Sequence, residues 1–291
     1  MELVSLNIVS REDSLKNLDK LPRLSPMLVQ FLGLVSQPGC EVGQLAEVVE
    51  KDTLLAAQIL QKANSAVFGR ITPIHSVQHA MAMLGVGTMR RFALGLSLSN
   101  LFGRFKSARS FSIRRFNLHS VATGTLVELL AEELPVVSRE SAFVAGLLHD
   151  IGKLLIAIHM PQQFEDVLAL SALTGDPATE CERQLLGVDH AELSSLAASR
   201  WDLSDAIVNA ARFHHVPERA RKVEPIPPGR VGLAMVVHKA DAFVNSLGLS
   251  VLPPGAPPKV WPDLDFGVRY PQSRVEQRFE VEKKNLRKLF Q

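Results

Sequence analysis

The stretch GLLHDIGKLL at residues 146–155 places a histidine and an aspartate side by side in an otherwise apolar run. On a helix of 3.6 residues per turn, His149, Asp150 and Lys153 fall within about 100° of arc, and leucines occupy the other faces. We therefore expect one long helix over residues 141–158 that directs three polar side chains into a single pocket.

Further histidines and one aspartate follow the same pattern of lying on, or at the end of, a predicted helix. In chain order, the candidate metal ligands are His119, His149, Asp150, His190, His214, His215 and Asp241. Five imidazoles and two carboxylates exceed the needs of one four-coordinate ion, so they predict two adjacent ions bridged by Asp150. A nitrogen and oxygen set without thiolate favours Fe, Mn, Zn or Ni.

Two adjacent ions beside a lysine suit phosphoester hydrolysis. The catalytic candidates are Asp150, as the bridge, and Lys153, as a point charge on a phosphoryl oxygen. Arg115 lies one helical turn before His119 and is placed to meet an anionic substrate or Asp241, although a solvated arginine is the more usual outcome.

Structural roles compete with these functional ones. Lys153 can instead extend from a buried helix to solvent, and His214 can act as a cation at a helix C-terminus. We assign Asp189 and Glu192 to a capping box. A single histidine on an apolar helix is more often a core residue than a ligand, and this reading is adopted for His75, His79, His159 and His238. The whole ligand set can also be a coincidence of motif matching.

The composition predicts an all-α protein. Hydrophobic residues make up 46% of the 291 residues and aromatic residues only 6%, a balance that favours helices over sheets. Cys40 and Cys181 lie far apart and fit buried thiols in a reducing compartment. The first residues lack the pattern of a signal peptide, and no apolar run of about 18 residues is visible, so a cytoplasmic protein without membrane insertion is expected.

Apolar periodicity and capping residues predict an array of helices. Asp52, Ser76, Asp189 and Ser204 are the expected N-caps, and Gly85-Val86-Gly87 is expected to interrupt the helical pattern. The helices are expected over residues 27–35, 42–50, 53–63, 77–84, 88–101, 113–133, 141–158, 190–200, 205–213, 231–246 and 274–289. The prolines from Pro253 to Pro262 predict an irregular segment before the last helix.

With these residues in view, the chain resembles the HDOD family, an N-terminal helical subdomain joined to an HD-superfamily core. LPRLSPMLVQFLGLV (21–35), KDTLLAAQILQKANSAVFG (51–69) and IHSVQHAMAMLGVGTMRRFAL (74–94) carry the first part of this resemblance. GLLHDIGKLLI, FHHVPE and VHKADAFVN carry the second. It implies an extension over residues 1–20, the helical HDOD part over 21–110, the HD-like core over 111–250, and a proline-rich segment with a basic helix over 251–291.

The resemblance implies a bacterial signalling module that acts on a protein partner on a separate chain. The ligand order is also similar to that of HD-GYP phosphodiesterases, which implies the alternative of an active phosphohydrolase acting on a nucleotide or cyclic dinucleotide. The GYP segment expected after His214 and His215 is absent, and VPERARKVEPIPPG stands in its place. This departure puts cyclic dinucleotide specificity in doubt. Nucleic-acid binding is not expected, because the net charge is only +2 and acids are interleaved with the basic residues after Arg274.

Overall fold

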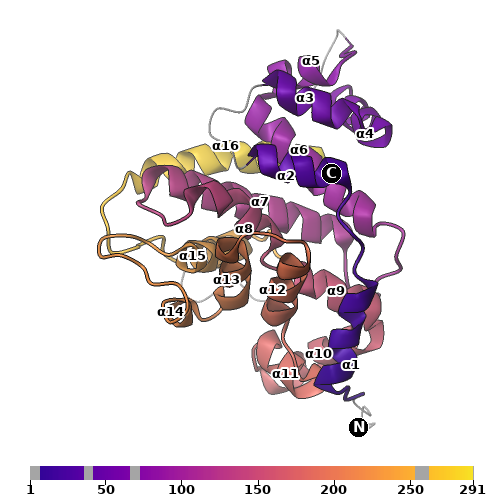
Figure 1. The fold of residues 1–291 in the computed structure, drawn as a ribbon, viewed down its shortest axis with the longest axis vertical. Coiled ribbons are helices and arrows are strands. Elements are labelled where there is room, and N and C mark those ends of the chain that lie inside the picture. The colour runs from indigo at the N-terminus through magenta and orange to yellow at the C-terminus, as the bar shows by residue number, and fades with distance from the viewer. Residues whose placement is uncertain (1–6, 36–41, 66–72, 253–261, 291) are drawn as a thin grey trace.

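The structure, a computed structural model, describes residues 7–35, 42–65, 73–252 and 262–290 (Figure 1). Within these residues there is no β-strand, and one isolated parallel bridge joins Val136 to Val231. The fold is all-α, as the composition predicted.

The chain up to the first candidate ligand forms a series of short helices that ends in one long helix. These are α1 (Arg11–Lys16), the 3-10 helix η1 (Asn17–Lys20), α2 (Pro26–Val35), α3 (Val42–Glu50), α4 (Thr53–Ala63), α5 (Val77–Leu84), α6 (Val86–Phe102) and α7 (Ile113–Glu133).

The remaining helices carry the other candidate ligands and the C-terminal segment. They are η3 (Arg139–Ser141), α8 (Ala142–Leu148), α9 (Ile151–His159), α10 (Pro161–Thr174), α11 (Ala178–Leu186), α12 (His190–Arg200), α13 (Asp205–Phe213), α14 (Pro217–Ala220), α15 (Leu233–Ser246) and α16 (Gln272–Phe290).

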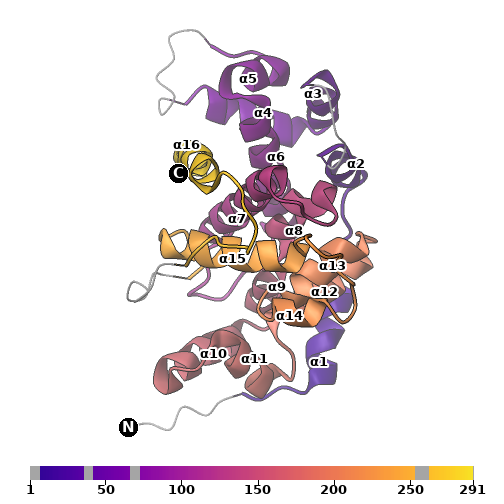
Figure 2. The same ribbon diagram turned by 90° about the vertical axis from the view of Figure 1, so that its left-hand side faces the viewer.

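The molecule is elongated, with the candidate ligands on the helices of its middle part. Helices α3, α4 and α5 form one end, and α10, α11 and α1 form the other, in both views (Figures 1 and 2). Between them, α7 packs against α8, α15 and α16, and α12 packs against α9 and α13. The N-terminal α1 reaches the far end, where the backbone N–H of Val9 donates to the Leu185 carbonyl.

Two hydrophobic clusters divide the interior, and the chain passes from one to the other at His149-Asp150. Leu148 belongs to the cluster that joins α2–α8 with α13, α15 and α16. Ile151 belongs to the cluster formed mainly by α9–α12 and the segment around Phe111. The polar dipeptide therefore lies at a junction of two apolar clusters, where side chains from both sides can meet it.

A close backbone contact holds α7 against α8. A Cβ atom on Gly146 would lie 2.7 Å from the Cα atom of Gly124, and one on Gly124 would lie 2.8 Å from the Phe143 carbonyl oxygen. Real Cβ atoms do not approach other atoms so closely, so both positions require glycine. This contact brings the two helices that carry His119 and His149 together.

The structure confirms most of the predicted helices and the N-cap roles of Asp52, Ser76 and Asp189. Ser204 precedes α13 but makes no capping hydrogen bond, because its hydroxyl instead lies 3.2 Å from the hydroxyl of Ser141. The expected interruption at 85–87 is confined to Gly85, which has φ of 89° and separates α5 from α6.

The single helix predicted over residues 141–158 is wrong. Helix α8 ends at Leu148, and α9 begins at Ile151. The N–H of Gly152 donates to the Ser194 hydroxyl at 2.8 Å, and the N–H of Lys153 bonds to the Asp150 carbonyl three residues back. These bonds replace the regular helical pattern, so His149 and Asp150 lie in a turn between two helices.

Several further predictions concern single residues. Cys181 is buried as expected, and Cys40 lies outside the described residues, as does the proline-rich segment from 253 to 261. His75 and His79 are exposed, which corrects their assignment to the core.

The stretch Arg139–His159 is long and apolar enough to cross a membrane, with mean hydropathy 1.6, but 94% of its apolar window is buried in the protein.

Candidate metal centre

The structure brings all seven ligand candidates together. They form two sets whose ligand atoms lie within 4.8 Å of one another. The first ligand set consists of His119, His149, Asp150 and Asp241, and the second ligand set consists of Asp150, His190, His214 and His215. Helices α7, α12 and α15, the turn after α8 and the end of α13 supply them. Only Asp150 belongs to both sets.

Asp150 directs one carboxylate oxygen to each set. Its Oδ2 atom lies 3.5 Å from Nε2 of His119 and 3.5 Å from Nε2 of His149. Its Oδ1 atom lies 3.3 Å from Nε2 of His190 and 3.6 Å from Nε2 of His214. The side chain is fully buried and does not cap α9, so both carboxylate oxygens face the two ligand sets.

The first ligand set converges on a small volume. Nε2 of His119 lies 3.2 Å from Oδ1 of Asp241 and 3.4 Å from Nε2 of His149. Asp241 is on the inner face of α15, and its Oδ1 also accepts a hydrogen bond from Asn245 one turn later. Two imidazole nitrogens and two carboxylate oxygens thus surround a space without a thiolate.

The outer ring nitrogens fix which atom of each histidine faces the site. Nδ1 of His119 donates to the Leu249 carbonyl, Nδ1 of His149 to the Gly146 carbonyl, and Nδ1 of His214 to the Ala211 carbonyl. In a neutral imidazole the other nitrogen then carries the lone pair. Nε2 is therefore the available ligand atom in all three rings, which is the arrangement found around protein metal ions.

In the second ligand set, Glu182 has this outer role for His190. The Glu182 carboxylate lies 2.7 Å from Nδ1 of His190 and also accepts the backbone N–H of His190 at 2.8 Å. Nε2 of His190 in turn lies 2.8 Å from Nε2 of His215. Glu182 is on α11, in a part of the chain for which the sequence analysis assigned no helix, and it was missed there. A histidine ligand commonly hydrogen-bonds a carboxylate, and the acids shortly before His190 were the available signal.

Buried atoms without partners support a cation between these groups. Within the described residues, Oδ1 of Asp150 and Nε2 of His214 are buried and make no hydrogen bond. Buried polar atoms are nearly always paired, and an acceptor oxygen facing a lone-pair nitrogen is unfavourable without positive charge between them. The donor set therefore fits divalent metal ions.

The directions of the pKa shifts also show that the site favours positive charge. Burial lowers the pKa of His119, but hydrogen bonds that its ring donates to the carboxylates of Asp150 and Asp241 outweigh burial and raise the pKa to about 9. Burial also lowers the pKa of His190, but the negative charge of Glu182 outweighs burial and raises this pKa to about 9. Burial raises the pKa of Asp150, but Lys153 and the imidazoles hold it well below its usual range. The carboxylates therefore stay ionised.

Lys153 adds a fixed cation next to the shared carboxylate. Its Nζ atom lies 2.6 Å from Oδ2 of Asp150, and its side chain keeps 19% of its surface exposed. The two residues thus share one face, as the helical spacing predicted, although the helix is interrupted between them and His149. The ammonium is neither isolated nor fully in solvent, so it can contact a ligand that approaches Asp150.

Arg115 and Glu192 do not have their proposed roles. Arg115 donates to the carbonyls of Ser250 and Leu252 instead of meeting Asp241. Glu192 pairs with Arg11 and Arg212 instead of completing the capping box.

The model of the HDOD domain family matches residues 21–217, which is more than half of the chain. The chain belongs to the HDOD family. This match includes six of the seven ligand candidates, and Asp241 lies beyond its end. The family assignment predicted from the sequence is therefore confirmed.

Solved structures with similar folds come from bacteria. A candidate phosphohydrolase from Shewanella amazonensis has 22% identity and a TM-score of 0.66, over 95% of this chain and 97% of that one. An HDOD domain protein of unknown function from Geobacter sulfurreducens has 23% identity and a TM-score of 0.64, over 96% and 94%. At these sequence identities, the similarity shows a shared HDOD fold and no more.

Two other relatives are longer than this chain. A candidate signal transduction protein from Marinobacter aquaeolei has 20% identity and a TM-score of 0.69, over 96% of this chain and 64% of that one. An uncharacterised protein of Treponema pallidum is 21% identical over 213 residues, which are 72% of this chain. The chain spans 40% of the length of this curated relative.

Proposed function

We propose that this HDOD protein is a bacterial signalling regulator that holds two divalent transition-metal ions. The observation that carries the proposal is the position of Asp150, which directs Oδ2 to the first ligand set and Oδ1 to the second. A carboxylate shared in this way is suited to bridge two ions. The nitrogen and oxygen donors are compatible with Fe, Mn, Zn or Ni.

The metal content of the purified protein, measured by elemental mass spectrometry, tests this proposal. About two ions per chain are expected for the wild type, following the two ligand sets. Asp150→Ala should lose both ions, whereas Asp241→Ala and His190→Ala should each lose the ion of one set. Asp166→Ala is the matched control, because Asp166 is also buried but pairs with Asn7 and Gln162.

The proposal fails if the reconstituted wild type holds no stoichiometric metal, or if Asp150→Ala binds as much metal as the Asp166→Ala control. A single ion per chain that is lost in Asp241→Ala but kept in His190→Ala would reject the bridged pair and leave the first ligand set alone.

Phosphoester hydrolysis is a second candidate function, favoured by the surroundings of the site. A cavity of about 190 Å³ reaches His215 and is lined by Arg183, Arg212 and Arg219. Arg183 and Arg212 are engaged with acids, and within the described residues Arg219 has no ion pair. Arg219 can therefore bind an anionic group at the entrance while Lys153 holds a phosphoryl oxygen near Asp150. Bound ions would supply an activated water and neutralise phosphate charge.

Hydrolysis of bis(p-nitrophenyl) phosphate by the metal-loaded protein tests the second function. We expect Lys153→Met to keep both ions and to lower turnover by about 100-fold, because it removes a charge aimed at the reacting group. Lys239→Met is the control, since Lys239 pairs with the exposed Asp263. Unchanged turnover in Lys153→Met, or no turnover by the loaded wild type, would exclude this role.

The regulatory role requires a signalling protein on a separate chain, which we propose as the partner. A comparison of two variants distinguishes metal binding from partner binding. If His149→Ala loses its metal and still binds the partner, the helical surface is a scaffold and the centre has another task. If His149→Ala loses both the metal and the partner, while His159→Ala retains both, the metal centre supports partner binding.

A further inference from the structure

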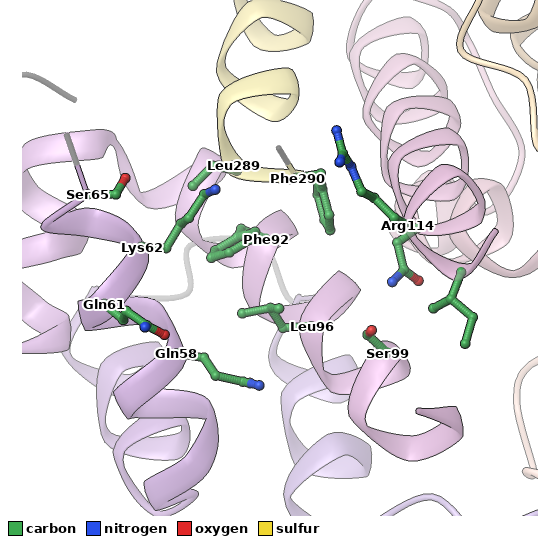
Figure 3. A pocket seen from close by; sticks show the side chains of 12 residues that line it. Gln58, Gln61, Lys62, Ser65, Phe92, Leu96, Ser99, Arg114, Leu289 and Phe290 are labelled. Carbon is green, nitrogen blue, oxygen red and sulfur yellow. The ribbon is translucent and has the colours of Figure 1, made fainter. Parts of the chain in front are cut away.

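A cavity of about 600 Å³ lies where four helices meet, away from both ligand sets. Helices α4, α6, α7 and α16 contribute Lys62, Phe92, Arg114 and Phe290 to its wall (Figure 3). This volume is within the range of small-molecule sites in proteins. No residue of either ligand set lines the cavity, so it is a separate feature of the fold.

Two cations face this cavity and have no carboxylate partner among the described residues. Figure 3 shows Lys62 reaching in from α4 and Arg114 from α7 on the other side. Within the described residues neither side chain has an ion pair. Burial and the charge of Arg114 lower the pKa of Lys62, so the two cations are close enough to repel each other. An anion between them would remove this repulsion.

The wall also offers polar groups that have no hydrogen-bond partner in the described part of the chain. The Ser65 hydroxyl oxygen is buried and has no hydrogen-bond partner within the described residues. Asn117, which is only 5% exposed, also lines the cavity, and its side-chain amide has no partner in that part of the chain. Because buried polar groups are normally paired, this hydroxyl and this amide are free to bind polar atoms of a ligand.

An aromatic surface completes the cavity. The rings of Phe92 and Phe290 meet edge to face, with centroids 5.4 Å apart and planes at 75°. Leu96 and Leu289 extend the apolar surface beside them (Figure 3). Ring faces and edges of this kind favour flat, apolar ligands.

We propose that this cavity binds a small organic anion whose aromatic body packs against Phe92 and Phe290. Its carboxylate or phosphate group lies between Lys62 and Arg114, and the hydroxyl of Ser65 and the amide of Asn117 bind its remaining polar atoms. The site is independent of the proposed metal centre, so either can fail without the other.

Titration calorimetry with three naphthalene probes tests the proposal on the wild-type protein. The probes are 1-naphthoate, 1-naphthylmethylphosphonate and the neutral 1-naphthamide, which share the ring and differ in the head group. At least one anion is expected to bind about tenfold more tightly than the amide. A tenfold ratio corresponds to about 1.4 kcal/mol of binding free energy, and a hydrogen bond to a charged group contributes more than this. The tighter of the two anions identifies the preferred head group.

Charge-removing variants then locate the binding. Lys62→Gln and Arg114→Gln should each weaken binding of the anion about tenfold and leave the amide unchanged. Lys51→Gln is the control, because Lys51 is an exposed lysine that pairs with Glu47 on α3. The proposal is overturned if neither anion binds, if the amide binds as tightly as the anions, or if both variants bind like the control.

Discussion

The Glu182 carboxylate lies 2.7 Å from Nδ1 of His190, and so it determines which nitrogen of this ring faces Asp150. We expect Glu182→Gln to lower the metal affinity of the second ligand set by about 10- to 100-fold, because outer partners of ligating histidines have effects of this size. Metal titration checks the affinity, and ¹⁵N NMR of His190 checks the tautomer. Glu180→Gln, two residues away on the exposed side of α11, should change neither.

Gly152 fixes the distance between α9 and α12. A Cβ atom there would lie 2.1 Å from the His190 carbonyl oxygen, and this contact is with backbone that cannot turn aside. Gly152→Ala should therefore destabilise the fold by about 3 kcal/mol and shift His190 away from Asp150. Urea unfolding measures the free energy. Gly33→Ala is the control, since nothing lies within 4 Å of that position, and it should unfold at the same or higher urea concentration.

The Arg91 side chain ties three helices together through buried charge. It pairs with Glu128 of α7 at 2.8 Å and with Glu282 of α16 at 3.1 Å, and it is 6% exposed. Removing one partner leaves an incompletely paired buried cation. We expect Glu128→Ala to lower the free energy of unfolding by about 3 kcal/mol, and the more exposed Glu132→Ala to cost less than about 1 kcal/mol. If Glu128→Ala and Glu132→Ala lower the free energy of unfolding equally in denaturant, the ion pair between Arg91 and Glu128 does not stabilise the fold as expected.

Stability should vary with pH through Glu192. Its hydrogen bond from Arg11 lowers the pKa to about 2, burial opposes this, and Arg212 adds to it. A carboxylate with a lowered folded-state pKa stabilises the protein above its unfolded pKa of about 4.5 and loses this effect as the pH falls towards 2.

Because Arg11 is half exposed, solvent screening limits the contribution of Glu192 to about 1 kcal/mol. Urea unfolding of the wild type and Glu192→Gln should differ by this amount at pH 7 and converge near pH 2. Glu140→Gln provides the comparison for an exposed glutamate. A difference between wild type and Glu192→Gln that does not change with pH would contradict the assignment.

The residues that meet at the site could be named from the sequence, because each ligand lies on or next to a helix whose apolar pattern or N-cap was visible there. The helix of His119 and the N-cap before His190 were predicted to the residue. Local signals of this kind are contained within a few residues of the chain.

What escaped prediction depends on contacts between distant segments. The break at His149-Asp150 follows from the bond between Gly152 and Ser194, which are 42 residues apart. The place of Arg115 depends on carbonyls 135 and 137 residues away. Periodicity within a helix cannot report such partners. Glu182 lies only eight residues before His190, and its role was missed because no helix was predicted over the residues of α11.

The contact between Gly124 and Gly146 has a consequence for how the site receives ions. Since the backbones of α7 and α8 touch there, packing alone sets the separation of His119 and His149. The entropy of ordering these ligands is therefore lost during folding, not during ion binding. Chelation should leave the helices folded, in contrast to small zinc domains that unfold without metal. The protein should then exchange one divalent ion for another in its native state, and the ions supplied by the cell would decide which pair it carries.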